Sequence, residues 1–486
     1  MGKVFEPDDV AGRIFDGTWR EAGGGPLEVT EPATGARLAV VGNATAADVR
    51  TAVAAASAAQ PAWAERPAGE RAAVLRRAAL VLEDGAGEVT RWLIREGGAT
   101  RAKAEFEIRS VLDELWTAAS LPTGPHGVLL PCDDGARSEG RRLPVGVVGV
   151  ISPWNFPLVL SLRAVAPALA LGNAVVLKPD PRTAVSGGVV PAWIFQEAGL
   201  PPGLLHVLPG GPEAGAALTA DPGTDMIAFT GSTAVGREVG ATAGRLLKRV
   251  SLELGGNNAL IVLEDADVEA ASSAGAFGSF LHQGQVCMTT GRHIVVASVA
   301  EEYVERLVRR ARALRVGDPA TGDVALGPVI DAGQLRRIDS LVRASVAAGA
   351  EVRCGGTHEG LFYRPTVLTG VTREMPVFRE EIFGPVAPVI VVADEEEALA
   401  VARDSEHGLV AAVHTGSAER GRALADRLPT GIVHVNGQTV NDNAHVPFGG
   451  RGASGNGTRF GAGHSWDAFT EWQWLTVRET APVYPF

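Results

Sequence analysis

The sequence contains very little cysteine. Cys132, Cys287 and Cys354 are the only three among 486 residues, they are far apart, and no C-x-x-C pair is present. A disulfide framework, a C-x-x-C redox couple and a zinc site of paired cysteines are therefore not expected. Thiols in this pattern are typical of the reducing cytoplasm, which is the location we predict.

Long apolar runs and clusters of basic residues are also absent. The longest apolar segment, RAVAPALALGNAVVL, is interrupted by Arg163, Pro167, Gly172 and Asn173 and falls short of the ~20 apolar residues that span a bilayer. The N-terminal MGKVFEPDDV has acidic residues where a signal peptide has a basic start, and Glu6 stands where a myristoylation motif has Ser or Thr. The net charge is -12, and Lys and Arg form no run longer than a pair. We therefore expect a soluble protein that binds neither membranes nor nucleic acid.

What is present is a regular alternation of apolar runs and amphipathic segments. Strands are predicted at 145–151, 173–179, 204–210, 225–231 and 249–255, with helical segments between the first four. Strands at 259–265, 293–299 and 431–436 and a helix at 301–314 predict a second block of the same kind. Continuous apolar strands that alternate with helices indicate an α/β fold with a parallel sheet covered on both faces. In such sheets ligands bind beyond the carboxyl ends of the strands.

Two further segments have a different pattern. Residues 48–120 are rich in alanine and predict helices. Residues 125–146 contain two short runs around DDGARSEG, which predict a projecting hairpin. Because an isolated hairpin is marginal in water, we expect it to pack against a partner surface such as another subunit.

Two glycine-containing segments compete as a phosphate-binding loop. GRGASG at 450–455 has the spacing G-x-G-x-x-G, but no predicted strand leads into it, so we interpret it as a chance match. FTGSTAVG at 229–236 lacks that spacing, yet it follows a predicted strand and opens a helix. Backbone N–H groups at such a helix start attract an anion such as a pyrophosphate. A plain strand-to-helix turn is the alternative.

Two polar side chains lie in or directly after predicted strands. Asn155 in SPWNFP stands between two prolines, where a fixed amide can stabilise an oxyanion; capping of the next helix is the alternative. Glu253 in LELGG has apolar neighbours, and burial would raise its pKa toward that of a usable general base. In a strand, the side chain of Glu253 and those of the flanking leucines point to opposite faces of the sheet. The sequence therefore leaves open whether Glu253 is buried or solvated.

Cys287 in GQVCMTT is the candidate nucleophile. The preceding glycine permits close approach of a substrate, and Thr289 and Thr290 can donate hydrogen bonds, so a thiolate here would be competent. Cys132 stands beside two aspartates that disfavour a thiolate, and Cys354 has only a nearby histidine as an activator. A buried structural cysteine is the alternative for Cys287.

Taken together, these segments resemble the aldehyde dehydrogenase superfamily. The resemblance follows, in order, FDGTW near residue 15, SPWNFP, KP at 178, FTGST, LELGG, GQVC, EEIFGP at 380 and PFGG at 447. LSLRAVAPALALGN, KPDPRTAVSGG and PFGGRGASGNG are similar to benzaldehyde dehydrogenase-like members, which oxidise aromatic aldehydes. The resemblance implies two doubly wound α/β domains, a Rossmann-like cofactor domain and a catalytic domain, with a small β oligomerisation arm. The implied boundaries are 1–120 and 144–255 for the NAD(P)-binding domain, 256–455 for the catalytic domain, and 121–143 with 462–486 for the arm.

The resemblance also implies a mechanism without a metal. Cys287 would be the nucleophile, Glu253 the general base, and Asn155 with the Cys287 backbone N–H the oxyanion hole. Attack would form a thiohemiacetal, and hydride transfer to NAD would leave a thioester that water hydrolyses. The implied cofactor-binding residues are Lys178 at the adenosine ribose, Gly231 and Ser232 at the pyrophosphate, Glu381 and Phe383 at the nicotinamide side, and also Ser152, Pro153 and Trp154. The implied substrate pocket is Phe156, Val159, Leu160, Arg163, Leu281, Met288 and Phe448, which is mostly apolar and suits a flat hydrophobic aldehyde.

Two departures from the family pattern leave questions open. Many NAD-preferring members have a Glu three residues after the KP lysine, whereas this chain has Pro181 followed by Arg182, so NADP use stays open beside NAD. The stretch GNGTRFG lacks the Arg-Glu-Leu of relatives, which leaves the proton route from Glu253 open. Arg163 could bind a substrate carboxylate, form an inward ion pair or lie on a helix surface.

Three alternative functions are weighed against oxidation of an aromatic aldehyde. The first is an aliphatic or semialdehyde dehydrogenase, and the second is a CoA-acylating enzyme, against which the retained Glu253 argues. The third is a non-catalytic relative with a structural or binding role, since fold alone does not fix function. The predicted partners are a small-molecule aldehyde and further copies of the chain, in a homodimer or homotetramer.

Overall fold

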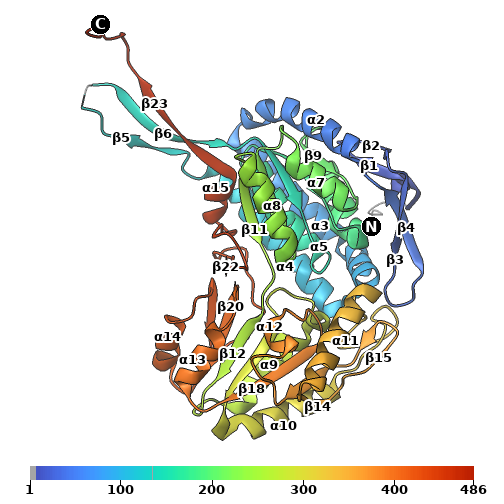
Figure 1. Ribbon diagram of the computed structural model, residues 1–486. Coiled ribbons are helices and arrows are strands. Elements are labelled where there is room, and N and C mark those ends of the chain that lie inside the picture. Colours follow the sequence, from blue (N-terminus) through green and yellow to red (C-terminus); the bar gives the residue numbers. More distant parts are fainter. Residues whose placement is uncertain (1–6, 134) are drawn as a thin grey trace.

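Two seven-stranded sheets form the centre of the molecule in the computed structural model (Figure 1). The structure describes residues 7–133 and 135–486. All strands of the first sheet precede residue 254 and all strands of the second follow residue 257, so the two sheets succeed one another along the chain.

The first sheet has a parallel core and an antiparallel edge. Its strands, in spatial order, are β11 (Arg249–Glu253), β10 (Met226–Thr230), β7 (Val147–Ile151), β8 (Ala174–Lys178), β9 (Leu205–Val207), β1 (Arg13–Phe15) and β2 (Trp19–Glu21). The strands from β11 to β9 are parallel, and β1 and β2 are antiparallel. The five predicted strands of this block are therefore confirmed. The three-residue strands β1 and β2 were not predicted, because runs so short carry no periodicity.

Helices cover both faces of the first sheet. One face carries α2 (Ala46–Ala64), α7 (Pro212–Ala220) and α8 (Thr233–Arg245). The other carries α5 (Pro157–Ala170) and α6 (Val190–Glu197), with α3 (Ala68–Gly97) and α4 (Arg101–Ser120) packed over them. The helices α2, α3 and α4 confirm the helical prediction for residues 48–120.

The second sheet is also buried on both faces. Its strands, in spatial order, are β14 (Glu351–Cys354), β17 (Thr366–Thr369), β18 (Val386–Val392), β13 (Thr290–Val296), β12 (Asn258–Val262), β20 (Val410–His414) and β21 (Ile432–Val435). One face packs against α9 (Val268–Phe280) and α10 (Ala297–Ala313), and the other against α11 (Ala332–Ala347), α12 (Pro376–Arg379), α13 (Glu395–Arg403) and α14 (Ala418–Ala425). Alternate residues of β12 belong to different apolar clusters, since Leu260 and Val262 face one side and Ile261 the other. This two-sided burial explains the continuous apolar runs in the sequence.

The predicted strand at 293–299 extends too far. The strand β13 ends at Val296, and α10 begins at Ala297. The apolar letters continue past Val296, but Ala300, Tyr303, Val304 and Leu307 are buried at helical spacing. Packing of that helical stripe ends the strand earlier than the local composition indicates.

The predicted hairpin is present as part of a projecting arm. The strands β5 (Gly127–Leu130) and β6 (Arg137–Pro144) pair antiparallel, and β23 (Thr470–Val477), which follows α15 (His464–Phe469), pairs with the other side of β6. Figure 1 shows this three-stranded sheet extending away from the body of the molecule.

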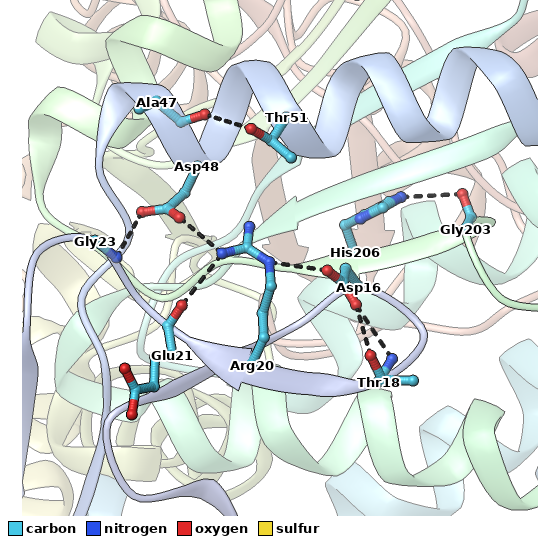
Figure 2. A network of polar contacts seen from close by, with 10 residues as sticks. All are labelled: Asp16, Thr18, Arg20, Glu21, Gly23, Ala47, Asp48, Thr51, Gly203 and His206. Carbon is cyan, nitrogen blue, oxygen red and sulfur yellow. Dashed lines mark hydrogen bonds and ion pairs between the residues drawn. The ribbon is translucent and has the colours of Figure 1, made fainter.

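A network of polar contacts fixes the antiparallel edge of the first sheet (Figure 2). The Arg20 guanidinium donates to Asp48 of α2 at 2.9 Å and to Asp16 at 2.8 Å. On β9, His206 donates from Nε2 to the Gly203 carbonyl oxygen at 3.0 Å. The short strands β1 and β2 are therefore held by side chains from neighbouring elements as well as by their own ladder.

The remaining short elements lie outside the two central sheets. They are α1 (Pro7–Val10), β3 (Pro26–Thr30), β4 (Arg37–Gly42), β15 (His358–Glu359), β16 (Phe362–Tyr363), β19 (His407–Gly408) and β22 (Arg451–Gly452). Among residues 7–133 and 135–486, no helix combines the length and the apolar character that crossing a membrane requires.

Candidate active site

The predicted catalytic residues gather where the two sheets approach each other. Glu253 is the last residue of β11, at the carboxyl end of the first sheet, and Cys287 lies shortly before β13, at the amino end of the second. A Cβ at Gly256 would be 2.5 Å from the Cys287 carbonyl oxygen, so this glycine permits the close approach. The first sheet thus follows the expectation that sites lie beyond carboxyl ends, while the second contributes its amino ends.

Cys287 is presented by a loop with unusual backbone geometry. His282, Gln283 and Gly284 have φ of 49°, 57° and 67°, in the left-handed region that costs about 1 to 3 kcal/mol for each residue other than glycine. The Gln283 side-chain amide donates to the carbonyl oxygens of Gly98 at 3.0 Å and Pro328 at 2.7 Å. These contacts hold the loop in place. In the sequence, only Gly284 indicated that the backbone adopts an unusual conformation here.

Two asparagine side chains fix the backbone on either side of Cys287. Asn155 donates from Nδ2 to the Gln285 carbonyl oxygen at 2.9 Å. Asn258 donates to the carbonyl oxygens of Cys287 and Thr289, each at 2.8 Å. Asn155 does not cap the following helix, which begins without a side-chain cap. Asn155 therefore lies beside the Cys287 loop, and its role in an oxyanion hole stays a prediction.

Glu253 is buried, which the sequence had left open. Its side chain is only 4% exposed, and its neighbours Leu252 and Leu254 are buried as well. Neither Glu253 carboxylate oxygen makes a hydrogen bond of good geometry within the described part of the chain. Burial raises the pKa of Glu253 to about 8, although Arg163 and Arg459 oppose the shift. A carboxyl group with this pKa can serve as a general base near neutral pH.

The Cys287 side chain is half-buried and lies near several acidic groups. Burial, together with the charges of Glu381, Glu253 and Asp442, raises the pKa of the thiol to about 12, while Arg163 opposes the shift. The thiol is therefore protonated near neutral pH before ligands bind, and attack on a carbonyl requires a base. Glu253 is the group in this set that has a raised pKa and no hydrogen-bond partner.

The two threonines that follow Cys287 do not serve the thiol. Thr289 donates its hydroxyl to the Gly284 carbonyl oxygen at 2.9 Å, and the Thr290 hydroxyl pairs with that of Thr439 at 2.8 Å. The prediction that these hydroxyls support a thiolate is therefore wrong, because each stabilises the loop and the start of β13 instead. Cys354, at the end of β14, contacts the Pro365 carbonyl oxygen at 3.8 Å and lies far along the chain from the other site residues.

The strand-to-helix turn at 229–236 has the geometry that the sequence predicted. The strand β10 ends at Thr230, and α8 begins at Thr233 with Ser232 as its N-cap. Gly231 donates its backbone N–H to the Glu253 carbonyl oxygen at 3.0 Å. This hydrogen bond links the turn directly to the strand that carries Glu253, and phosphate binding by the turn stays a prediction.

Lys178 is the last residue of β8, which lies two strands from β10 in the same sheet, and it is buried. Burial lowers its pKa, and within the described ranges its ammonium group makes no hydrogen bond or ion pair. A buried ammonium group without a partner is suited to a polar ligand such as a ribose. In contrast, the Ser152 hydroxyl pairs with that of Ser161 at 2.7 Å, so its side chain is already engaged.

Aromatic and acidic residues complete the predicted cofactor cleft. Trp154 meets the Phe383 ring edge to face, with centroids 5.4 Å apart, and Pro153 precedes it in the same turn. Phe383 has a left-handed φ of 54°. Glu381 accepts the Gly256 N–H at 3.0 Å, and burial raises its pKa to about 7.

Arg182 joins the two halves of the molecule beside this cleft. It forms ion pairs with Asp180 at 2.8 Å and with Asp331, the N-cap of α11, at 2.9 Å. Its guanidinium carbon lies 5.1 Å from the centre of the Trp154 ring. Two carboxylates therefore already engage Arg182, the residue that follows Pro181.

The segment GRGASG does not form a phosphate loop. The Ser454 hydroxyl donates to the Gly255 carbonyl oxygen at 2.6 Å, and the Leu254 N–H donates to the Ser454 carbonyl oxygen at 3.0 Å. Its polar groups thus support the strand that carries Glu253, and no helix starts directly after it. This agrees with the interpretation of the spacing as a chance match.

The apolar residues of the predicted substrate pocket pack in the same large cluster as Cys287. These residues are Phe156, Val159, Leu160, Leu281, Met288 and Phe448. Arg163 forms an inward ion pair, one of the three alternatives, with Glu114 at 3.1 Å and with Asp442. A cavity of about 170 Å³ contains Arg163. The rest of its lining, from α4 and residues 442–444, was missed because neither segment has a recognisable motif.

The sequence matches the aldehyde dehydrogenase family over residues 19–475. The chain belongs to this family. A vanillin dehydrogenase of Amycolatopsis sp. is 56% identical over 483 residues, with 99% of each chain covered. A benzaldehyde dehydrogenase [NAD(+)] of Pseudomonas putida is 50% identical over 476 residues, with 98% of each chain covered.

Solved aldehyde dehydrogenase structures confirm the predicted fold class. Betaine aldehyde dehydrogenase from Staphylococcus aureus, in complex with NAD+, has a TM-score of 0.94 at 27% identity and covers 98% of this chain and 96% of its own. An NADP-dependent enzyme from E. coli has a TM-score of 0.94 at 32% identity and covers 98% of this chain and 100% of its own. Structural neighbours of this aldehyde dehydrogenase thus include proteins described with either dinucleotide.

Proposed function

We propose that this aldehyde dehydrogenase oxidises aromatic aldehydes to carboxylic acids with NAD as the electron acceptor. The full-length similarity to enzymes that act on vanillin and benzaldehyde supports the substrate class. The observation that carries the chemistry is the buried Glu253 carboxyl group, without a hydrogen-bond partner, whose charge acts on the desolvated Cys287 thiol.

Cys287 is the proposed nucleophile. Its sulfur forms a bond to the aldehyde carbon while its proton leaves to a base, which we assign as Glu253, and a thiohemiacetal results. Loss of two electrons and one hydrogen from this adduct leaves a thioester on Cys287. Glu253 first passes the proton from the thiol to solvent. The ionised carboxylate then takes a proton from water, whose oxygen attacks the thioester carbon; the carbon–sulfur bond breaks, the carboxylic acid leaves, and the Cys287 thiolate takes the proton back from Glu253.

Asn155 is the proposed oxyanion donor together with the Cys287 backbone N–H. The Asn155 amide nitrogen carries two hydrogens, and one of them is directed to the Gln285 carbonyl oxygen. The second remains for the oxygen of the thiohemiacetal, which gains negative charge as the carbon–sulfur bond forms. Anchoring through Gln285 keeps this donor at a fixed position relative to Cys287.

The cleft residues fit a dinucleotide. When bound, NAD supplies the acceptor for the electrons and hydrogen that leave the adduct. We assign Lys178 to the ribose hydroxyls, the Gly231 and Ser232 turn to the pyrophosphate, and Glu381 with Phe383 to the nicotinamide side. Ser152, Pro153 and Trp154 form the wall that connects these parts.

The contacts of Arg182 support NAD over NADP. The Arg182 guanidinium is already paired with Asp180 and Asp331, so it is not free to bind a 2′-phosphate. Those carboxylates would also repel a phosphate placed beside them. The absence of the usual glutamate at Pro181 therefore does not by itself create a phosphate site.

We also propose that the protein is a homodimer or homotetramer in the cytoplasm. The arm presents exposed apolar side chains, among them Val128, Trp472 and Trp474, that a second subunit would cover. The location rests on the cysteine pattern.

A direct assay tests the proposed function. The purified protein is mixed with benzaldehyde and NAD, and NADH is followed by its absorbance, with Cys287→Ala as the control. We expect turnover for the wild type and none for the variant. If neither protein forms reduced cofactor with any aromatic or aliphatic aldehyde, whether NAD or NADP is supplied, the proposal is contradicted.

Glu253→Gln separates the two chemical steps. Because thioester hydrolysis needs the base, this variant is expected to give a burst of NADH of about one equivalent per site and then to stall. Rapid mixing resolves the burst from the steady state. Steady turnover at the wild-type rate would remove the base assignment while leaving Cys287 in place.

A further inference from the structure

The cavity that contains Arg163 is lined mainly by polar and charged side chains, and it would form the polar end of the otherwise apolar substrate pocket that the sequence predicts. Its volume is about 170 Å³. Its lining comes from α4, α5 and the loop before Phe448, and the polar residues that matter here are Glu114, Arg163 and Asp442. Phe448 forms an apolar wall beside this polar end, with its ring centre 4.6 Å from the Arg163 guanidinium carbon.

Arg163 and Asp442 each keep one unsatisfied atom despite their ion pair. Arg163 is only 5% exposed and donates from Nε to Glu114 at 3.1 Å and from Nη2 to Asp442 Oδ2. Its Nη1 has no hydrogen-bond partner within the described chain, and neither does Asp442 Oδ1. A buried donor and a buried acceptor left unpaired cost about 1 to 3 kcal/mol each, so a site that retains both is suited to a ligand that satisfies both.

This unsatisfied pair is part of the site around Cys287. A Cβ at Gly449 would be 2.8 Å from Glu253 Oε1, and the preceding residue, Phe448, carries the ring that lies under Arg163. Phe448 thus connects the general base to the polar end of the cavity. The charges of Arg163 and Asp442 also reach the Cys287 thiol.

We propose that Arg163 and Asp442 recognise a hydroxyl group on the aromatic ring of the aldehyde. Arg163 Nη1 donates to the hydroxyl oxygen, and the hydroxyl donates to Asp442 Oδ1. A neutral phenol is the group that matches this arrangement, because it donates and accepts at a single atom. The inference rests on the proposed function and narrows its substrate class to ring-hydroxylated benzaldehydes.

Isosteric substrate pairs test this assignment. We compare 3- and 4-hydroxybenzaldehyde with 3- and 4-methylbenzaldehyde by kcat/KM, at a pH low enough to keep the phenol neutral. The wild type is expected to prefer the hydroxyl member of at least one pair by about tenfold or more, since the methyl group leaves two buried polar atoms unpaired. In Asp442→Ala, the ratio of kcat/KM for the hydroxyl member to kcat/KM for the methyl member is expected to fall to about the value that apolar contacts alone would give.

Asn441→Ala is the matched control, because it alters the exposed neighbour of Asp442 in the same loop. Its preference ratio should equal that of the wild type. Arg163→Met is the second variant. Its melting temperature is measured as well, because the substitution leaves the buried Glu114 without its cation and can destabilise the protein. If it folds, it should lose the preference as Asp442→Ala does.

Two outcomes would overturn the inference. One is a wild type that does not distinguish hydroxyl from methyl members in either pair, and the other is an unchanged preference in Asp442→Ala. In both cases benzaldehyde itself would still be oxidised, so the proposed function would stand. If no aromatic aldehyde is oxidised by the wild type, the proposed function fails instead.

Discussion

At the residue scale, desolvation acts on Glu253 and Cys287 in the same direction. It raises the pKa of Glu253 to about 8 and that of Cys287 to about 12. Both groups are therefore mostly protonated near neutral pH. Because Glu253 loses its proton at a lower pH than Cys287, the carboxyl group is the one that can act as the base. The buried Arg163 and the nearby Arg459 limit the shift at Glu253.

The first prediction concerns the pH dependence of turnover. The base acts when deprotonated, so hydrolysis-limited turnover should fall as the pH drops below about 8 and should level off above it. The measurement is kcat against pH with saturating benzaldehyde and NAD. In Glu253→Gln the residual kcat should not fall as the pH drops below about 8. If kcat falls in the same way in both proteins, another group is responsible for the titration.

A second prediction concerns Arg459. A Cβ at Gly449 would lie 2.7 Å from Arg459 Nη1 and 2.8 Å from Glu253 Oε1, so the two side chains flank the same glycine. Removing the positive charge in Arg459→Met should raise the pKa of Glu253 and move the midpoint of the kcat profile to higher pH. Arg459→Lys, which keeps the charge, should restore most of the shift. Midpoints that agree in all three proteins would exclude this electrostatic role.

At this scale, the sequence identifies the candidate functional residues better than it predicts their burial and their contacts. The motifs identified Cys287, Glu253 and Asn155, but the alternating parity of LELGG could not decide the burial of Glu253. The hydroxyl groups of Thr289 and Thr290 were assigned to the thiol, whereas Thr289 donates to the Gly284 carbonyl oxygen of the folded loop and Thr290 pairs with the distant Thr439. Such hydrogen bonds depend on tertiary contacts, which a local pattern does not contain.

At the element scale, α4 positions the start of α5. Lys103 donates from Nζ to the Asn155 carbonyl oxygen at 2.9 Å and pairs with Glu107. Glu107 accepts the backbone N–H of Leu158 at 2.9 Å, in the first turn of α5, where a carboxylate is stabilised by the helix dipole. A buried ion pair on one helix thereby fixes the turn that carries Asn155.

The third prediction tests this buried pair. Glu107→Gln removes a charge that pairs with Lys103, so the free energy of unfolding should fall by roughly 3 kcal/mol and kcat should fall with it. Denaturant unfolding and steady-state kinetics give the two values. The control is Glu105→Gln on the exposed face of the same helix, which should change neither. A stable variant with normal kcat would remove the positioning role of α4.

The presence of strands, although not their exact ends, followed the sequence where burial is two-sided. The strands β7, β8, β10 and β12 are apolar apart from Lys178, Thr230 and Asn258 at strand ends, because helices cover both faces of their sheets. The misplaced end of β13 and the missed edge strands β1 and β2 have a different cause. There the structure depends on a helical stripe and on side chains such as Arg20, which contact distant segments.

At the scale of the whole molecule, the site exists because two sheets face each other. The first supplies Glu253, Lys178 and the turn before α8 at its carboxyl end, and the second supplies Cys287 at its amino end. Arg182 bridges the two through Asp180 and Asp331. The order of motifs along the chain indicated the family, but neither this facing arrangement nor the bridge has a local signal in the sequence.

The last prediction concerns the arm. Val128 lies opposite Gly140, which lies opposite Trp474, so all three share one face of the arm sheet, and Trp472 lies on it two residues from Trp474. Val128 is 53%, Trp472 55% and Trp474 73% exposed. A face so apolar on a projecting sheet is unfavourable in water unless a second subunit covers it. Trp474→Asp should therefore weaken self-association by about tenfold or more.

Sedimentation velocity over a range of concentrations measures this change. The matched control is Leu247→Asp, because Leu247 is 93% exposed but lies just after α8 in the body of the molecule. That variant should associate as the wild type does. If Trp474→Asp keeps the wild-type oligomer at every concentration, the apolar face of the arm is not the subunit interface. An interface elsewhere in the molecule would then have to account for any oligomer.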